Sequence, residues 1–222
     1  MGPVPSSYAS GADVAALLVL LTEFAMLRAP QLRSQVRLYA FQSLVVVVLT
    51  AVTGAVRGHP DLYILAALSL LLKVVIVPAL MLRLLREIDA GQLHHPAGGG
   101  GGSTVLVAIA VSVFGFFALR SLGFHSKVLP TATLSVAVAI VLVAFVLVVL
   151  RSDVVSQAVG FFSVENGVSI VSMAIAAGLP VVVEVSFLFD LLVAVVVFGL
   201  IMRAHHARAG TLSTEALDRL RG

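Results

Sequence analysis

Cysteine and tryptophan are both absent from this chain of 222 residues. Without cysteine, the chain can form no disulfide, no cysteine-ligated iron–sulfur cluster and no thiolate zinc site. Any electron transfer in which this protein takes part must therefore use a cofactor that a partner binds.

Charged residues are also scarce, at 11% of the chain, whereas 60% of the residues are hydrophobic and the mean hydropathy is +1.12. Soluble domains usually have about 25% charged residues. The composition therefore predicts an integral membrane protein. The basic residues lie at the ends of apolar runs and form no basic stripe, so nucleic acid is not an expected partner.

The apolar runs predict an all-α bundle of about seven transmembrane helices, each ended by charge, proline or glycine. These spans cover approximately residues 12–27, 38–56, 61–82, 104–119, 130–150, 154–177 and 181–202. Only three residues separate the last two spans, which predicts an antiparallel hairpin. In the third span, Pro78 removes a backbone donor and predicts a kink near Val74.

A glycine-rich stretch, residues 91–103, predicts a flexible cytoplasmic linker. It separates a three-helix part, residues 1–90, from a four-helix part, residues 104–203, and residues 204–222 form a cytoplasmic tail. Basic residues are concentrated on one predicted side, which places the N-terminus outside and the C-terminus in the cytoplasm. That side holds Arg28, Arg33, Arg37, Arg83, Arg86, Arg151, Arg203, Arg208, Arg219 and Arg221, and the other holds Arg57, Arg120 and Lys127.

The ionisable residues inside the predicted spans include Lys73, Glu165, Glu184 and Asp190. An ionisable group at the bilayer centre costs at least ~2.5–3.5 kcal/mol on insertion scales, so it is rarely present without a use. These residues are therefore candidates for a proton path. The alternative for Glu165 is a protonated structural acid, with Ser163 and Asn166 as hydrogen-bonding partners.

Glu23 belongs to the first span but lies close to its cytoplasmic end. This position favours a solvated or salt-bridged residue over a part of the path. For Lys73, an ion pair with an acid such as Glu23 and a relay role are equally compatible with the sequence.

Three segments of the chain, QVRLYAFQSLVVVVLTAV, LLLKVVIVPALMLRLLRE and SQAVGFFSVENGVSIVSMAIAAGLPVVVEVSFLFDLLVAVVVFG, carry a family resemblance. In these segments the chain resembles component E of hydrogenase-4, a membrane subunit of group 4 energy-converting hydrogenase and formate hydrogenlyase complexes. Its last three spans, about residues 130–203, are similar to the K-type subunit of respiratory complex I and to the C-type subunit of cation/proton antiporters.

The resemblance implies a non-catalytic membrane-arm subunit that lies beside antiporter-like subunits and helps to carry protons. In the K-type family, one acid on each of the second and third helices has this role. Glu165 lies about one turn from the first position, near Phe162. Glu184 matches the second position by sequence order, and Asp190 matches it by depth in the helix.

The chain contains no nucleophile–histidine–acid set and no histidine at the centre of a span, so we expect no catalytic site, cofactor or metal in it. The leading hypothesis is a proton-translocating and assembly subunit of a hydrogenase-like complex in the cell membrane of a prokaryote. A subunit of a multisubunit cation/proton antiporter and a structural spacer are the alternatives.

Overall fold

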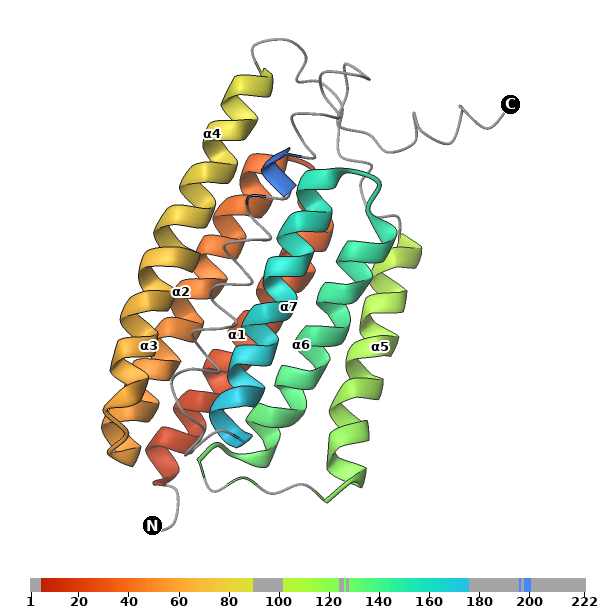
Figure 1. Cartoon of the computed structure of the whole chain (residues 1–222). Coiled ribbons are helices and arrows are strands. Elements are labelled where there is room, and N and C mark those ends of the chain that lie inside the picture. Colours follow the sequence, from red (N-terminus) through yellow and green to blue (C-terminus); the bar gives the residue numbers. More distant parts are fainter. Residues whose placement is uncertain are drawn as a thin grey trace.

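The structure, a computed structural model, describes residues 5–89, 102–123, 126, 128–175, 196 and 198–200. These residues fold into a bundle of roughly parallel and antiparallel helices (Figure 1). The helices are α1 (Ser6–Arg28), α2 (Leu32–Arg57), α3 (Asp61–Ser69), the π-helix η1 (Leu70–Ile76), α4 (Val77–Asp89), α5 (Gly102–Ser121), α6 (Thr131–Leu150) and α7 (Val154–Ile175).

Six helical segments of the described residues are long and apolar enough to cross a membrane, because α3, η1 and α4 continue one another as a single span. This confirms the prediction of an all-α, multi-pass membrane protein for the first six spans. The first span begins at Ser6, one and a half turns before its predicted start. The seventh predicted span lies largely outside the described residues, and the side of the membrane on which each end lies stays a prediction.

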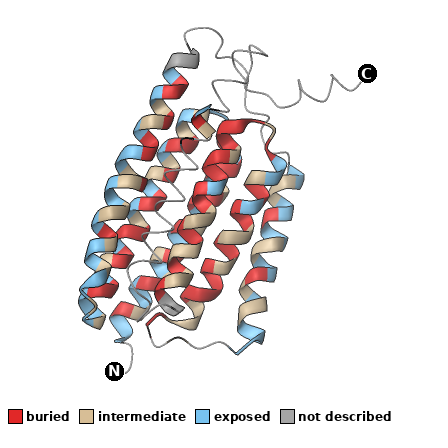
Figure 2. Ribbon diagram, in the orientation of Figure 1, coloured by how far each residue is buried: buried red, intermediate tan, exposed pale blue. Residues whose placement is uncertain are grey.

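Four helices, α1, α2, α6 and α7, form the centre of the bundle, and α5 packs on its outside against α6 (Figures 1 and 2). In α6 and α7, 61% of the most apolar segment is buried within the bundle, compared with 11% in α5. The apolar outer face of α5 is therefore left for lipid or another membrane subunit.

The third span contains a π-helix at Leu70–Ile76, one turn before Pro78. Proline has no backbone N–H, so it disturbs the helical hydrogen bonds in the preceding turn. π-helical segments inside α-helices occur frequently at functional sites. The buried residue of this π-helix is Lys73, so the irregular backbone coincides with the charge inside the membrane.

Helices α6 and α7 approach closely because α7 has glycine at two points of contact. A Cβ atom at Gly160 would lie 3.0 Å from the backbone nitrogen of Val148 and 3.2 Å from the carbonyl oxygen of Ala144. A Cβ atom at Gly167 would lie 3.1 Å from the backbone nitrogen of Val141. These obstacles are backbone atoms, so a larger residue would push the two helices apart.

Gly160→Ala should therefore destabilise the subunit by about 1–3 kcal/mol, the usual cost of overpacking a core. Gly11→Ala is the control, since a Cβ atom there would meet nothing within 4 Å. Thermal unfolding of the purified protein in detergent measures both changes. Equal unfolding midpoints for the two variants would contradict the close approach of α6 and α7.

Candidate functional site

A buried ion pair joins the π-helix to α7 near the middle of both membrane spans. The amino group of Lys73 lies 3.0 Å from a carboxylate oxygen of Glu165, and the two side chains are 3% and 13% exposed. The same amino group donates a hydrogen bond of 3.0 Å to the hydroxyl of Ser169. Because Glu165 and Ser169 are one helical turn apart, both face η1.

A second polar cluster, which we call the Glu23 cluster, consists of Glu23, Gln42, Ser43, Ser163 and Asn166. All five side chains are fully buried. The Gln42 amide donates to Glu23 at 2.7 Å, and the Ser163 hydroxyl contacts both Glu23 and, at 2.7 Å, the Gln42 carbonyl oxygen. The Asn166 amide donates to the Gln42 carbonyl oxygen at 3.0 Å and to the Ser43 hydroxyl at 2.9 Å. This cluster therefore joins α1, α2 and α7 in the interior of the bundle.

Helix α7 contributes to both groups through adjacent faces. Ser163 and Asn166, three residues apart, point toward α1 and α2, whereas Glu165 and Ser169 point toward η1. The same two turns of α7 thus carry residues of both the Glu23 cluster and the ion pair, on adjacent faces of the helix.

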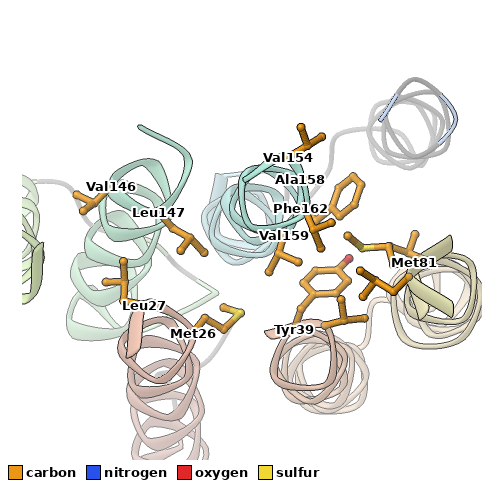
Figure 3. Close-up of a cluster of buried hydrophobic side chains, with 14 of the residues drawn as sticks. Met26, Leu27, Tyr39, Met81, Val146, Leu147, Val154, Ala158, Val159 and Phe162 are labelled. Carbon is orange, nitrogen blue, oxygen red and sulfur yellow. The ribbon is translucent and has the colours of Figure 1, made fainter. Parts of the chain in front are cut away.

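Tyr39 of α2 lies at the boundary between the two groups, one turn before Ser43. It is fully buried, and its ring lies 5.8 Å from the ring of Phe162. Figure 3 shows Tyr39 between Phe162 of α7 and Met81 of α4. Tyr39 therefore lies among apolar core residues, Phe162 and Met81 among them, at the edge of the polar interior.

A third polar group lies at the end of the bundle where α1 and α6 end and α2 and α7 begin. The Arg151 guanidinium donates hydrogen bonds to the carbonyl oxygens of Met26, Leu27 and Ala29 at 3.4, 2.9 and 3.2 Å. Burial lowers the pKa of Arg151, and the charge of Asp153 opposes this shift. These contacts cap the last turn of α1, whose carbonyl groups have no partner within the helix.

At the same end, Gln35 and Asp153 connect the starts of α2 and α7. The Gln35 amide also donates to the carbonyl oxygen of Ala29, at 3.1 Å, and its own carbonyl oxygen accepts a hydrogen bond of 2.6 Å from Ser156. Asp153 accepts a hydrogen bond of 2.7 Å from the backbone N–H of Ser156, which caps α7. This polar group holds four helix ends together.

The structure brings together two of the four predicted path residues, Lys73 and Glu165. Glu184 and Asp190 lie outside the described residues. The expectation that Glu23 is a solvated or salt-bridged end residue is wrong, because Glu23 is fully buried and hydrogen-bonded to neutral side chains. Lys73 pairs with Glu165 and not with Glu23.

Sequence reasoning also missed the role of Gln42 and placed Ser163 and Asn166 beside Glu165, whereas both contact the Glu23 cluster. Gln42 was detectable in principle, since it is a lone amide in a span without any charge. Counting amides as well as charges within apolar runs would have selected it.

Comparison with known proteins gives matches to bacterial proteins over most of the chain. Hydrogenase-4 component E from Escherichia coli and from Shigella flexneri is 28% identical over 210 residues, which cover 92% of this chain and 94% of the relative. The chain is similar to hydrogenase-4 component E along almost its whole length. This confirms the resemblance to hydrogenase-4 component E that the sequence segments indicated.

An uncharacterized protein from Mycobacterium tuberculosis is 25% identical over 209 residues, 94% of this chain and 95% of the relative. No protein family model and no solved structure matches the chain. The similarity to hydrogenase-4 component E therefore rests on full-length sequence relatives. Nothing in these comparisons tests the predicted likeness of residues 130–203 to the K-type subunit of complex I.

Proposed function

We propose that this chain is a membrane subunit of a hydrogenase-like respiratory complex and that it carries protons through the middle of the bilayer. The complex would lie in the cell membrane of a prokaryote, with other membrane subunits, antiporter-like ones among them, as partners. The similarity to hydrogenase-4 component E supports the type of complex. The chain's own buried acids and lysine would serve proton movement and assembly, and Glu184 and Asp190 would continue the path.

The observation that carries this proposal is the ion pair of Lys73 and Glu165 inside the membrane. Two opposite charges in a low-dielectric interior are costly to desolvate, and apolar residues of similar size are often at least as stabilising. Membrane helices associate through small and apolar residues, so a spacer needs no such pair. Ionisable groups inside membranes mark proton and ion pathways in many proteins.

The pair also has the chemistry that a proton path needs. Transfer of one proton from the Lys73 ammonium to the Glu165 carboxylate converts the ion pair into two neutral groups. Both states keep a hydrogen bond across the 3.0 Å contact. A proton can therefore move between Lys73 and Glu165 without leaving an isolated charge in the bilayer.

Glu165→Gln in the assembled complex tests the proposal. Glutamine keeps the shape and hydrogen-bonding capacity of the acid but cannot take up a proton. Proton translocation into sealed membrane vesicles should fall by about 10²-fold, the typical contribution of a positioned proton-transfer group. Glu165→Asp should retain part of the activity.

Asp13→Asn is the matched control, because Asp13 lies on α1 near the opposite end from Glu23 and accepts a hydrogen bond of 2.5 Å from Thr133. It should translocate protons like the parent. If Glu165→Gln assembles and translocates protons at the parental rate, Glu165 is not on the path.

A further inference from the structure

The contacts around Ser163 fix the number of hydrogen atoms that the Glu23 cluster must contain. The Ser163 oxygen is in contact with two other oxygen atoms, one of Glu23 and one of Gln42. A serine hydroxyl has one hydrogen, and a glutamine carbonyl oxygen has none. Two oxygen–oxygen contacts need two hydrogens, so the second must belong to the Glu23 carboxyl group.

The amide hydrogens of the cluster cannot supply this hydrogen, since they already have acceptors. The two Gln42 hydrogens point to Glu23 and to the carbonyl oxygen of Val19, and the two Asn166 hydrogens point to Gln42 and Ser43. All four amide hydrogens are thus used. Within these contacts, the second hydrogen needed around the Ser163 oxygen can come only from the Glu23 carboxyl group.

The result does not depend on which way the Gln42 amide is turned, an orientation that is always assigned from its neighbours. If its nitrogen and oxygen are exchanged, the Gln42 oxygen lies 2.7 Å from the Glu23 oxygen. Two oxygens at this distance also need a hydrogen between them, and Glu23 must again provide it. Both orientations therefore require a protonated Glu23.

From this count we infer that Glu23 is a second proton-carrying acid of the bundle, held neutral by Ser163 and Gln42 and placed beside a face of α7 adjacent to the one that carries Glu165. This inference rests in part on the proposed function, because it extends the same proton path to α1. The two acids differ in their surroundings: Glu165 faces a cation, whereas the hydrogen-bonding partners of Glu23 among the described residues are neutral side chains.

A row of hydrogen bonds connects the Glu23 carboxyl group to side chains of α2 and α7. From Glu23 it passes through Ser163 and Gln42 to Asn166 and then to Ser43. Glu165 lies on the adjacent face of the same two turns of α7 that carry Ser163 and Asn166. Glu23 and Ser163 can exchange a proton by breaking one O–H bond and forming another, with no oxidation or reduction, while the amides of Gln42 and Asn166 hold the two groups in place by hydrogen bonds.

Infrared spectroscopy of the whole purified complex tests the protonation state directly. A protonated carboxyl group has its own C=O stretching band, distinct from that of a carboxylate. The parent protein should show a band from a buried protonated acid that Glu23→Gln removes, whereas Glu165→Gln and Asp13→Asn leave that band in place. Ser163→Ala should shift the same band, because it removes one hydrogen-bonding partner of Glu23.

Proton translocation supplies the second readout. Glu23→Gln should slow translocation by about 10-fold or more if Glu23 carries protons. An unchanged band in Glu23→Gln, or a parental translocation rate in that variant, overturns the inference. If Glu23→Gln does not assemble, the band shift in Ser163→Ala decides, and an unshifted band overturns the inference.

The outcomes for Glu23 and Glu165 can be separated. Failure of the proposed function would appear as parental proton translocation in Glu165→Gln, whatever the infrared band shows. Failure of this inference would appear in the Glu23 variants while Glu165→Gln is still impaired.

Discussion

Lys73→Met should lower the stability of the assembled subunit by about 3–5 kcal/mol, the usual cost of removing one member of a buried ion pair. Methionine leaves the Glu165 carboxylate without its cation at 3.0 Å in the interior of the membrane bundle. The carboxylate must then take up a proton or remain as an uncompensated charge. We expect little assembled complex on a native gel and almost no proton translocation.

The double variant Lys73→Met/Glu165→Gln separates a structural role of the pair from a role in proton transfer. It removes both charges at once, so no buried charge is left unpaired. Assembly should return to nearly the parental amount, while proton translocation stays low. Recovery of both would mean that the pair only holds η1 against α7, and the path would then have to run elsewhere.

The predicted fold followed from the composition because the bilayer restricts the choice so strongly. A spanning segment must satisfy its own backbone hydrogen bonds, so long apolar runs without charges predict helices with few alternatives. The limits of α6, predicted at 130–150 and found at Thr131–Leu150, illustrate this. The start of α1 was predicted six residues too late because residues 6–11 are mostly polar or small and do not extend the apolar run.

The candidate site could be predicted only in part, since a sequence gives the depth of a residue in the membrane but not its partner. Lys73 and Glu165 were both recognised as buried, yet their pairing depends on how α7 packs beside η1. The position of Glu23 near the end of its span suggested contact with solvent. The neighbouring helices cover it completely, and Gln42 and Ser163 take the place of water.

A large loss of stability is also expected from Arg151→Ala, for a reason that has nothing to do with proton transfer. The guanidinium of Arg151 donates to three carbonyl oxygens at the end of α1 and is 3% exposed. Alanine would remove the Leu27 carbonyl's hydrogen bond from the guanidinium and leave Asp153 without the cation, whereas Ala29 keeps Gln35 and Met26 keeps the Ala29 N–H as donors. The cost should be roughly 3 kcal/mol or more, because a buried acceptor that loses its donor costs about 1–3 kcal/mol and the buried Asp153 carboxylate also loses a nearby cation.

Arg151→Lys should recover only part of this loss. An ammonium group is compact, whereas the planar guanidinium presents several donors in a fixed arrangement. Arg120→Lys is the matched control: Arg120 ends α5 in an exposed position, with its guanidinium 5.2 Å from the centre of the Phe116 ring. In detergent, the midpoint of thermal unfolding should be lowest for Arg151→Ala, higher for Arg151→Lys and highest for the parent. The midpoint of Arg120→Lys should equal that of the parent. The complex that Arg151→Lys does form should translocate protons at the parental rate per assembled unit, because the guanidinium of Arg151 donates to backbone carbonyl groups at the end of α1. A rate lowered as much as in Glu165→Gln would place Arg151 on the path instead.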